Sequence, residues 1–210
     1  MGNEQGRTLV LLDGVPLNKS DGGSVNWNAI PQASIGQIEV VKGPGSSIHG
    51  GNAMGGVIHM ISRTAVEKLE VNASQGYGTF NTWDSQLELQ GRNQKFYWGV
   101  SGMYRNSEGY LTQPADEIDE YSIPSFLDEY RASARAGYEI KTGQTIEASL
   151  AYYDGKRGTG SSFMGYGFEN ENLAASEGAF NRFGSLNGRL VYRAALANEG
   201  LLNISIYGQR

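Results

Sequence analysis

The sequence has no cysteine and only two histidines among its 210 residues. Without cysteine there is no disulfide bond, thiolate nucleophile or cysteine-ligated metal, although the redox environment stays open. His49 and His59 lie ten positions apart and have no nearby acidic residue to complete a ligand set, so a zinc site is poorly supported. We expect His59, which alternates with apolar residues, to be a hydrogen-bonded structural residue.

Long apolar runs are also missing. The longest uninterrupted apolar segments span four or five residues, as in Leu9 to Leu12, whereas a membrane-spanning helix needs about 20. This excludes transmembrane helices. It does not exclude transmembrane β-strands, which need an apolar residue only at every second position over about 9–11 residues.

An excess of positive charge is missing as well. The 17 Lys and Arg residues are outnumbered by 22 Asp and Glu residues, and no stretch combines basic with aromatic residues. We therefore expect no nucleic-acid partner. No charged segment followed by an apolar one comes after Met1, so either the protein stays inside the cell or the chain is not the whole gene product.

Catalytic and nucleotide-binding motifs are equally hard to find. The stretch GPGSSIHGGNAMGG (43–56) lacks the Gly-Lys-Ser/Thr of a phosphate-binding loop and leads into a strand. Ser46 and Ser47 lack the Gly-x-Ser-x-Gly context of a nucleophile elbow, and no nucleophile, base and orienting residue come together. We expect neither an enzyme nor a bound cofactor.

What the sequence has in abundance is glycine, with 30 residues, and tyrosine, with 12. Two patterns meet near residue 64. Before it, short apolar segments alternate with Gly-, Asn- and Ser-rich stretches, and Asp13-Gly14 is a turn signal. A short helix from Asn28 to Ser34, with Pro31 in its first turn, would complete a small α+β unit.

From residue 67 onward, apolar and polar residues alternate with a period of two, which predicts β-strands. In one segment, for example, Tyr130, Ala132, Ala134, Ala136 and Tyr138 alternate with Arg131, Ser133, Arg135 and Glu139. About seven antiparallel strands are expected, in the ranges 69–74, 83–90, 96–105, 130–139, 145–152, 185–194 and 202–209.

The connections between these strands alternate in length. Segments 92–94, 141–144 and 197–200 are tight turns, whereas 111–126 and 155–179 are long. Short turns on one rim and long loops on the other are typical of an outer-membrane barrel, in which aromatic residues near the strand ends form interfacial girdles. The candidates for such girdles are Tyr77, Phe80, Trp83, Phe96, Tyr97, Trp98, Tyr104, Tyr110, Tyr152, Tyr153, Phe180 and Phe183.

A soluble antiparallel sandwich has the same alternation and is the alternative. Two details favour the membrane: the polar strand faces carry Arg, Glu, Ser, Asn and Gln instead of mainly Lys and Glu, and the apolar faces include many Ala and Gly. The loop PADEIDEYSIPSFLDEY could hold calcium through its carboxylates, but a solvated acidic loop is the favoured interpretation; the acidic residues are Asp116, Glu117, Asp119, Glu120, Asp128 and Glu129.

The first 63 residues resemble a known family. RTLVLLDGVPLN (7–18) and NWNAIPQASIGQIEVVKGPGSSIHGGNAMGGVIHMISR (26–63) are similar to the second half of the plug domain of TonB-dependent outer-membrane receptors. The phrases LLDGVPLN, IEVVKGP and NAMGGVI stand in the family's order and spacing, and the strands that follow, with GYGTF (76–80) and Trp83, resemble the first third of its barrel. Lys42, His49 and His59 depart from the residues usual in the family.

The resemblance implies a mainly β protein with two parts. Residues 1–64 would be the C-terminal half of a plug, and residues 65–210 the N-terminal portion of an incomplete transmembrane β-barrel. Because family members begin with a signal sequence and end after many more strands, we expect the chain to be a fragment of a longer gene product.

The function implied by the resemblance is active uptake of a scarce ligand across the outer membrane of a Gram-negative bacterium. The ligand would be a small molecule such as a siderophore, haem, cobalamin or an oligosaccharide, with energy from TonB acting on a plug segment that this chain lacks. The candidate ligand contacts lie in the loop from Asn18 to Trp27 and are Lys19, Asp21, Ser24, Asn26 and Trp27. A passive porin, which would lack the plug signature, and a soluble β-rich binding module or adhesin are the alternatives.

Overall fold

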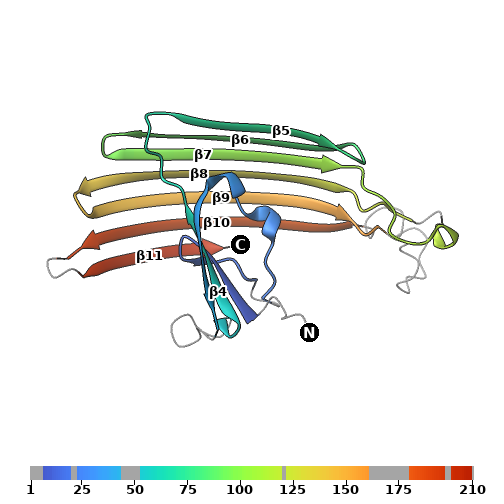
Figure 1. Ribbon diagram of the computed structural model, residues 1–210, viewed down its shortest axis with the longest axis horizontal. Helices are drawn as coiled ribbons and strands as arrows, with labels where there is room; N and C mark the ends of the chain where they lie inside the picture. Colours follow the sequence, from blue (N-terminus) through green and yellow to red (C-terminus); the bar gives the residue numbers. More distant parts are fainter. Residues whose placement is uncertain are drawn as a thin grey trace. The chain divides into compact units, whose positions relative to one another are not determined.

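The structure is a computed structural model of the chain, and it describes residues 7–19, 23–43, 53–119, 122–160, 180–196 and 200–209. The chain forms two compact units, Met1–Val66 and Glu67–Arg210. Their regular structure is almost entirely β-strand (Figure 1). Within the described ranges, none of the helices has the length and apolar content to cross a membrane.

The first unit is a four-stranded sheet in the order β2-β1-β4-β3. β1 pairs in parallel with β4, and the other two pairs are antiparallel. The strands are β1 (Thr8–Leu12), β2 (Val15–Pro16), β3 (Ile35–Lys42) and β4 (Gly56–Ser62).

The turn between β1 and β2 confirms the Asp13-Gly14 signal. Both residues have positive φ, 50° and 85°, as a type I′ hairpin turn requires. The Asp13 carboxylate also accepts hydrogen bonds from the backbone nitrogen of Ser62 at 2.8 Å and from its hydroxyl at 2.7 Å. The turn is thereby attached to the end of β4.

The short helix expected between Asn28 and Ser34 is present only as two separate 3₁₀ turns, η2 (Trp27–Ala29) and η3 (Gln32–Ser34). Pro31 explains the interruption. A proline disfavours helical dihedral angles at the preceding residue, and Ile30 is accordingly extended, with φ −83° and ψ 127°.

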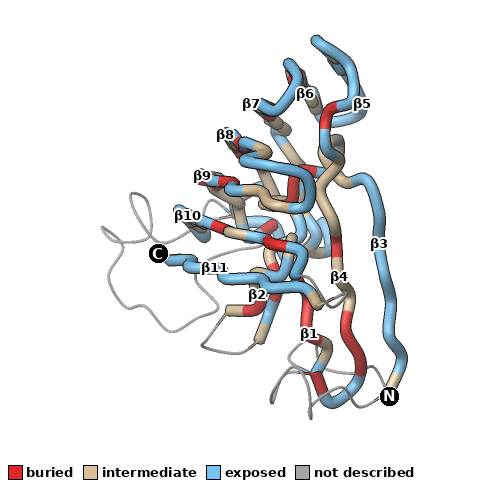
Figure 2. Tube along the Cα trace, turned by 90° about the vertical axis from the view of Figure 1, so that its left-hand side faces the viewer, coloured by how far each residue is buried: buried red, intermediate tan, exposed pale blue. Residues whose placement is uncertain are grey.

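This sheet has a small core on each face. Leu9, Leu11, Ala53 and Val57 form one cluster, and Val10, Val25, Ile30 and Met60 form the other. Successive residues of β1 thus point to opposite faces, as the period of two demands. The edge strand β3 is exposed along most of its length (Figure 2).

The second unit is a seven-stranded antiparallel sheet in chain order, β5 to β11 (Figure 1), as predicted. Strand lengths run from 9 to 16 residues, enough for a tilted strand to cross a bilayer. The strands are β5 (Glu70–Gly78), β6 (Thr82–Asn93), β7 (Phe96–Ser107), β8 (Leu127–Lys141), β9 (Gln144–Gly158), β10 (Phe180–Ala195) and β11 (Leu201–Gln209).

One connection departs from the expected pattern. The turns β6–β7, β8–β9 and β10–β11 share one rim, and the long connections β7–β8 and β9–β10 share the other. The connection from β5 to β6 also lies on the long-loop rim, yet it contains only residues 79–81.

The two faces of this sheet differ in chemistry, and burial follows the polar face. Glu88, Gln90, Glu129, Arg131 and Glu147, all on one face, are at most 8% exposed. The opposite face carries exposed aliphatic residues, among them Leu87 (48%), Val100 (43%), Leu150 (54%), Leu190 (46%) and Ile206 (67%). We call these the polar face and the apolar face. A soluble sandwich would bury its apolar face, so the distribution is that of a membrane sheet.

The prediction that Tyr97, Tyr153 and Phe183 belong to interfacial girdles is wrong, because the strand register places all three on the polar face. Tyr97 and Tyr153 lie on the polar face and are only 5% and 2% exposed. The register explains their position, because Tyr97 is paired with Gly137 and Tyr153 with Arg131, both polar-face positions. Their hydroxyl groups bond to buried carboxylates instead of facing a membrane interface.

Candidate functional site

The loop from Asn18 to Trp27 is anchored by the side chain of its first residue. The Asn18 amide oxygen accepts a hydrogen bond from the Val10 backbone nitrogen at 2.8 Å. The amide nitrogen donates to the backbone oxygens of Thr8 and Gly23, both at 2.9 Å. Asn18 is 8% exposed and forms a β-bridge with Val25, so the side chain ties β1 to both sides of the loop.

Sequence reasoning chose this loop but missed Asn18. An asparagine after an apolar segment is ordinary turn composition, and nothing in the local sequence shows which backbone groups surround it. Thr8 and Val10 reach the side chain only because β1 and the loop are adjacent in the fold.

Within the loop, backbone hydrogen bonds join Lys19 to Gly23 and Ser24. The Lys19 backbone nitrogen donates to the Ser24 oxygen at 2.9 Å, and the Gly23 nitrogen donates to the Lys19 oxygen at 2.9 Å. Ser24 is exposed and Lys19 is half-buried. The predicted contact Asp21 lies outside the described residues.

Asn26 and Trp27 close the loop. The Asn26 amide oxygen accepts a hydrogen bond from the Asn28 backbone nitrogen at 3.3 Å and so caps η2. Trp27 is 43% exposed although Val25 and Ile30, on either side of it, are buried. The buried neighbours thus hold the Trp27 ring at the surface of the first unit.

The polar face of the second unit carries a chain of buried charges. The Tyr97 hydroxyl donates to Glu147 Oε2 at 2.9 Å, and Arg189 Nη2 donates to Glu147 Oε1 at 2.5 Å. Gly137 lies between Tyr97 and Glu147 in the strand register, and a Cβ there would overlap the Tyr97 ring. One tyrosine side chain therefore crosses β8 to reach β9, and the arginine extends the link to β10.

A second set of the same residue types lies nearer the long-loop rim. Glu129 Oε1 accepts hydrogen bonds from the Tyr153 hydroxyl at 2.8 Å and from Arg157 Nη2 at 2.5 Å, and Glu129 is fully buried. A Cβ on Gly155 would come within 2.6 Å of the Tyr153 hydroxyl oxygen. A glycine again leaves the space that a tyrosine occupies.

Further ion pairs extend this network toward both rims. Arg92 pairs with Glu139 at 2.8 Å, and Arg105 pairs with Asp84. In every pair named on this face the cation is an arginine, whose planar fork bonds a carboxylate in two directions. Such charges are costly to bury singly but stable as hydrogen-bonded pairs.

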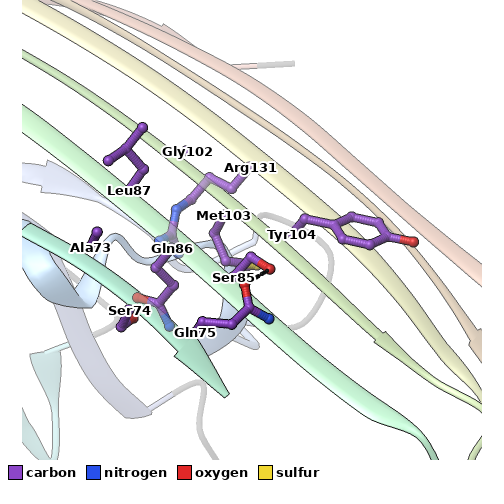
Figure 3. Close-up of a pocket in the computed structure, with 10 residues that line it drawn as sticks. All are labelled: Ala73, Ser74, Gln75, Ser85, Gln86, Leu87, Gly102, Met103, Tyr104 and Arg131. Atoms are coloured by element: carbon purple, nitrogen blue, oxygen red, sulfur yellow. Dashed lines mark hydrogen bonds between the residues drawn. The ribbon is translucent and has the colours of Figure 1, made fainter. Parts of the chain in front are cut away.

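The polar face also holds a shallow depression of about 590 Å³ (Figure 3). Ser74, Gln86, Met103 and Arg131 form one cross-strand row at its centre. A hydroxyl, an amide, a thioether and a guanidinium can hydrogen-bond and pack against a polar or anionic molecule. They supply no nucleophile and base pair for covalent chemistry.

The described acidic residues between β7 and the start of β8 lie in two different segments. The first ones lie in and after the 3₁₀ turn η5 (Ala115–Glu117), whereas Asp128 and Glu129 belong to β8. Glu120 lies outside the described residues. In the part of the chain that the structure describes, no three His, Cys, Asp or Glu side chains are placed to hold a metal ion.

His59 has one acidic neighbour that the sequence did not reveal. Its Nδ1 lies 3.5 Å from Glu39 Oε2 on the adjacent strand β3. This contact gives His59 a partner within the sheet, whereas its Nε2 is buried and has no hydrogen-bond partner among the described residues, so the hydrogen-bonded role stays a prediction. His49 lies outside the described residues.

A separate small sheet unit and a membrane-type sheet with a polar, arginine-rich face define the class of plugged β-barrel proteins. Comparison with known sequences agrees: residues 1–57 match the family model described as the TonB-dependent Receptor Plug Domain. The chain belongs to the TonB-dependent receptors, which are outer-membrane proteins of Gram-negative bacteria.

Two curated relatives and a solved structure support the assignment. The chain is 38% identical over 159 residues to the vitamin B12 transporter BtuB of Vibrio vulnificus (strain YJ016), covering 72% of this chain and 25% of that protein. It is 28% identical over 178 residues to the rhizobactin receptor of Rhizobium meliloti (strain 1021), covering 74% and 22%. The chain thus spans about a quarter of the length of these relatives.

The solved structure is the ferric enterobactin receptor PfeA from Pseudomonas aeruginosa in complex with BCV-L6. The TM-score is 0.73 at 15% identity, and the match covers 97% of this chain and 33% of that one. At this identity the similarity shows a shared fold. The named relatives are transporters and receptors, not enzymes.

Proposed function

We propose that this chain is part of a receptor for the active uptake of a scarce small molecule across the outer membrane of a Gram-negative bacterium. Residues 1–64 would belong to the plug and residues 65–210 to the barrel. The ligand would be a siderophore, cobalamin, haem or an oligosaccharide. TonB would be the energy-coupling partner, and no residue described here is assigned to that contact.

The main support for the proposal is that the seven-stranded sheet buries its polar face and exposes its apolar face. On β8, Tyr130 and Tyr138 bracket three alanines on the apolar face. Eight residues at about 3.3 Å each, in a strand tilted by about 40°, cross about 20 Å of bilayer. This approaches the apolar band of about 25 Å in outer-membrane barrels. A soluble binding module would not leave such a band exposed.

The ligand contacts proposed in the first unit are Lys19, Asp21, Ser24, Asn26 and Trp27. The hydrogen bonds of Asn18 support this choice, since Asn18 and Val25 are buried and fix the two described sides of the loop. Trp27 offers an exposed aromatic ring. The Asn26 amide oxygen caps η2, so its amide nitrogen is the group it would offer to a ligand.

Binding measurements on the receptor purified at its native length test this assignment. The probes are cyanocobalamin and ferric enterobactin, chosen because relatives are named for vitamin B12 and for ferric enterobactin. Trp27→Ala and Asn26→Ala should weaken binding of the probe that the wild type binds by about tenfold. Trp98→Ala, on the apolar face, is the matched control and should leave affinity unchanged.

Two results would count against the proposal in different ways. Unchanged affinity in both loop variants would remove the loop from the binding site while leaving the receptor function intact. Recovery of the protein in the soluble fraction without detergent would favour the soluble binding module instead.

A further inference from the structure

Four exposed aromatic residues gather at the long-loop rim of the second unit. Tyr77 and Trp83 are a cross-strand pair at the ends of β5 and β6, Phe80 lies in the turn between them, and Tyr110 follows β7. They are 64%, 49%, 51% and 52% exposed in that order. We call this group the aromatic tip.

The aromatic tip is one connected arrangement. The ring centroids of Tyr77 and Trp83 are 4.8 Å apart, and those of Phe80 and Tyr110 are 5.0 Å apart. The Tyr77 hydroxyl donates to the Asn81 amide oxygen at 2.8 Å, and Asn81 is the residue after Phe80. The two ring pairs are therefore linked through the turn.

Presenting Phe80 here requires unfavourable backbone geometry. Phe80 and Asn81 have φ of 58° and 50°, values that a bulky residue rarely adopts. The backbone of Phe80 is held by the Glu108 nitrogen, which donates to its oxygen at 3.0 Å. A glycine would relieve the strain, so a phenylalanine at this position favours a role for its ring.

The backbone of Tyr110 is also held by hydrogen bonds. Its backbone oxygen accepts a hydrogen bond from the Ser125 nitrogen at 2.8 Å, and its own nitrogen donates to the Ser125 hydroxyl at 3.3 Å. Gly109, with φ of 69°, allows the close approach of these two segments, because a Cβ there would overlap Ser125. The rings are held in place before any partner arrives, which lowers the entropic cost of binding.

The aromatic tip lies next to further aromatic residues on the apolar face. Tyr104, Tyr130 and Tyr152 occupy that face on β7, β8 and β9, and the Tyr130 and Tyr152 rings lie 5.8 Å apart. Polar residues also lie beside Phe80, namely Thr79, Asn81 and Glu108. Aliphatic residues such as Leu87 and Val100 lie farther along the strands. The aromatic tip thus adjoins the apolar face and lies beyond its aliphatic residues, toward the long-loop rim.

We propose that the aromatic tip binds the sugar headgroup of an outer-leaflet glycolipid. A pyranose ring has an apolar C–H face that packs against aromatic rings, while its hydroxyls reach polar neighbours. Acyl chains would instead favour an aliphatic surface. The long-loop rim is the extracellular one in outer-membrane barrels. The inference rests on the proposed membrane location of this sheet.

A fluorescence titration tests the proposal with the receptor purified at its native length. The sequence has three tryptophans, so replacing Trp27 and Trp98 with Phe leaves Trp83 as the only reporter in this part of the receptor. The protein is inserted into three kinds of phosphatidylglycerol vesicle: one without glycolipid, one with lipid A, and one with lipopolysaccharide that carries its core sugars. The receptor should bind lipopolysaccharide with core sugars at least about fivefold more tightly than lipid A, and free core oligosaccharide should compete.

Variants separate binding from stability. Phe80→Ala and Tyr110→Ala should each reduce the affinity for the sugar-bearing lipid by about fivefold, and Phe80→Tyr should retain it. Phe80→Gly relieves the positive φ, so it should preserve or raise thermal stability and still lose binding. Tyr138→Ala, an exposed aromatic on the opposite rim, is the control and should bind like the wild type.

The outcomes distinguish this inference from the proposed function. Equal Trp83 responses with and without core sugars, in protein that has inserted into all three vesicles, would overturn the glycolipid site alone. Unaltered affinity of Phe80→Gly would do the same. Failure of the wild type to insert into any vesicle would overturn the membrane location and the glycolipid site together.

Discussion

The Tyr97 hydroxyl donates a 2.9 Å hydrogen bond to Glu147, a residue 50 positions later in the chain. The two side chains meet across Gly137, the residue between them in the register of β7, β8 and β9. On the other side of Glu147, Arg189 from β10 supplies the balancing charge at 2.5 Å. Three strands, β7, β9 and β10, are thereby linked through one buried carboxylate, across the glycine of β8.

The missing side chain at Gly137 should be essential to this link. Gly137→Ala would place a methyl group on the Tyr97 ring and force the tyrosine away from Glu147. We expect a loss of about 2–4 kcal/mol in unfolding free energy, from overpacking and a broken hydrogen bond to a charge. Urea unfolding in lipid vesicles measures it. Gly208→Ala, where a Cβ meets nothing within 4 Å, is the control, and an equal effect of both variants would contradict the explanation.

Removing one partner of the buried Arg189–Glu147 ion pair should lower the unfolding free energy more than replacing both partners with apolar residues. Arg189→Met leaves the Glu147 carboxylate buried without its cation and should destabilise the protein by about 3–5 kcal/mol. The double variant Arg189→Met with Glu147→Leu removes both charges and should recover more than half of that loss. A double-mutant cycle from unfolding midpoints gives the coupling. Additive losses would show that the pair does not act as a unit.

Asn18 should determine whether the loop from Asn18 to Trp27 keeps its shape. Asn18→Ala removes three hydrogen bonds and leaves the buried Val10 N–H without its acceptor. We expect a loss of about 2–3 kcal/mol and faster hydrogen exchange at the Val10 amide. Ser24→Ala, at an exposed position, should change stability by less than about 0.5 kcal/mol. Undiminished protection of Val10 in the Asn18 variant would contradict this role.

An arginine on the apolar face should destabilise the protein more at the middle of the membrane than at its interface. Ala134 lies midway between Tyr130 and Tyr138 on β8. Ala134→Arg should lower stability in bilayers by about 2–4 kcal/mol, whereas Tyr138→Arg, at the expected interface, should cost about 1 kcal/mol from the charge. The fraction of folded protein in lipid vesicles measures both. If the Ala134→Arg variant remains folded and needs no lipid, the membrane assignment is wrong.

Much of the second unit was predictable because a period of two is a local property. All seven expected strands are present, and β8 has the alternation read from Tyr130 to Glu139. The assignment of aromatics to girdles failed for Tyr97, Tyr153 and Phe183, which lie on the polar face. Tyr97 and Tyr153 each lie beside another aromatic residue, Trp98 and Tyr152, so composition alone did not indicate which of each pair faces the lipid.

The first unit was predictable where the local sequence decides the backbone and less so elsewhere. Asp13-Gly14 forms the expected turn because both residues tolerate positive φ. The helix expected from Asn28 to Ser34 reduces to two 3₁₀ turns, because Pro31 forces Ile30 into an extended conformation. A proline in the first turn, as the sequence predicts, would leave the helix intact, whereas Pro31 interrupts it.

The amino-acid sequence by itself determined the β-rich class, the number of long strands and the resemblance to TonB-dependent receptors, since alternation and turn chemistry act between near neighbours. Only the tertiary structure decided that Asn18 holds the loop, that Tyr97 reaches Glu147 over Gly137, and that Phe80 stacks on Tyr110. These contacts join residues from 8 to 50 positions apart in the chain. Strand register brings Tyr97 to Glu147, and a shift of one residue would turn either side chain to the other face.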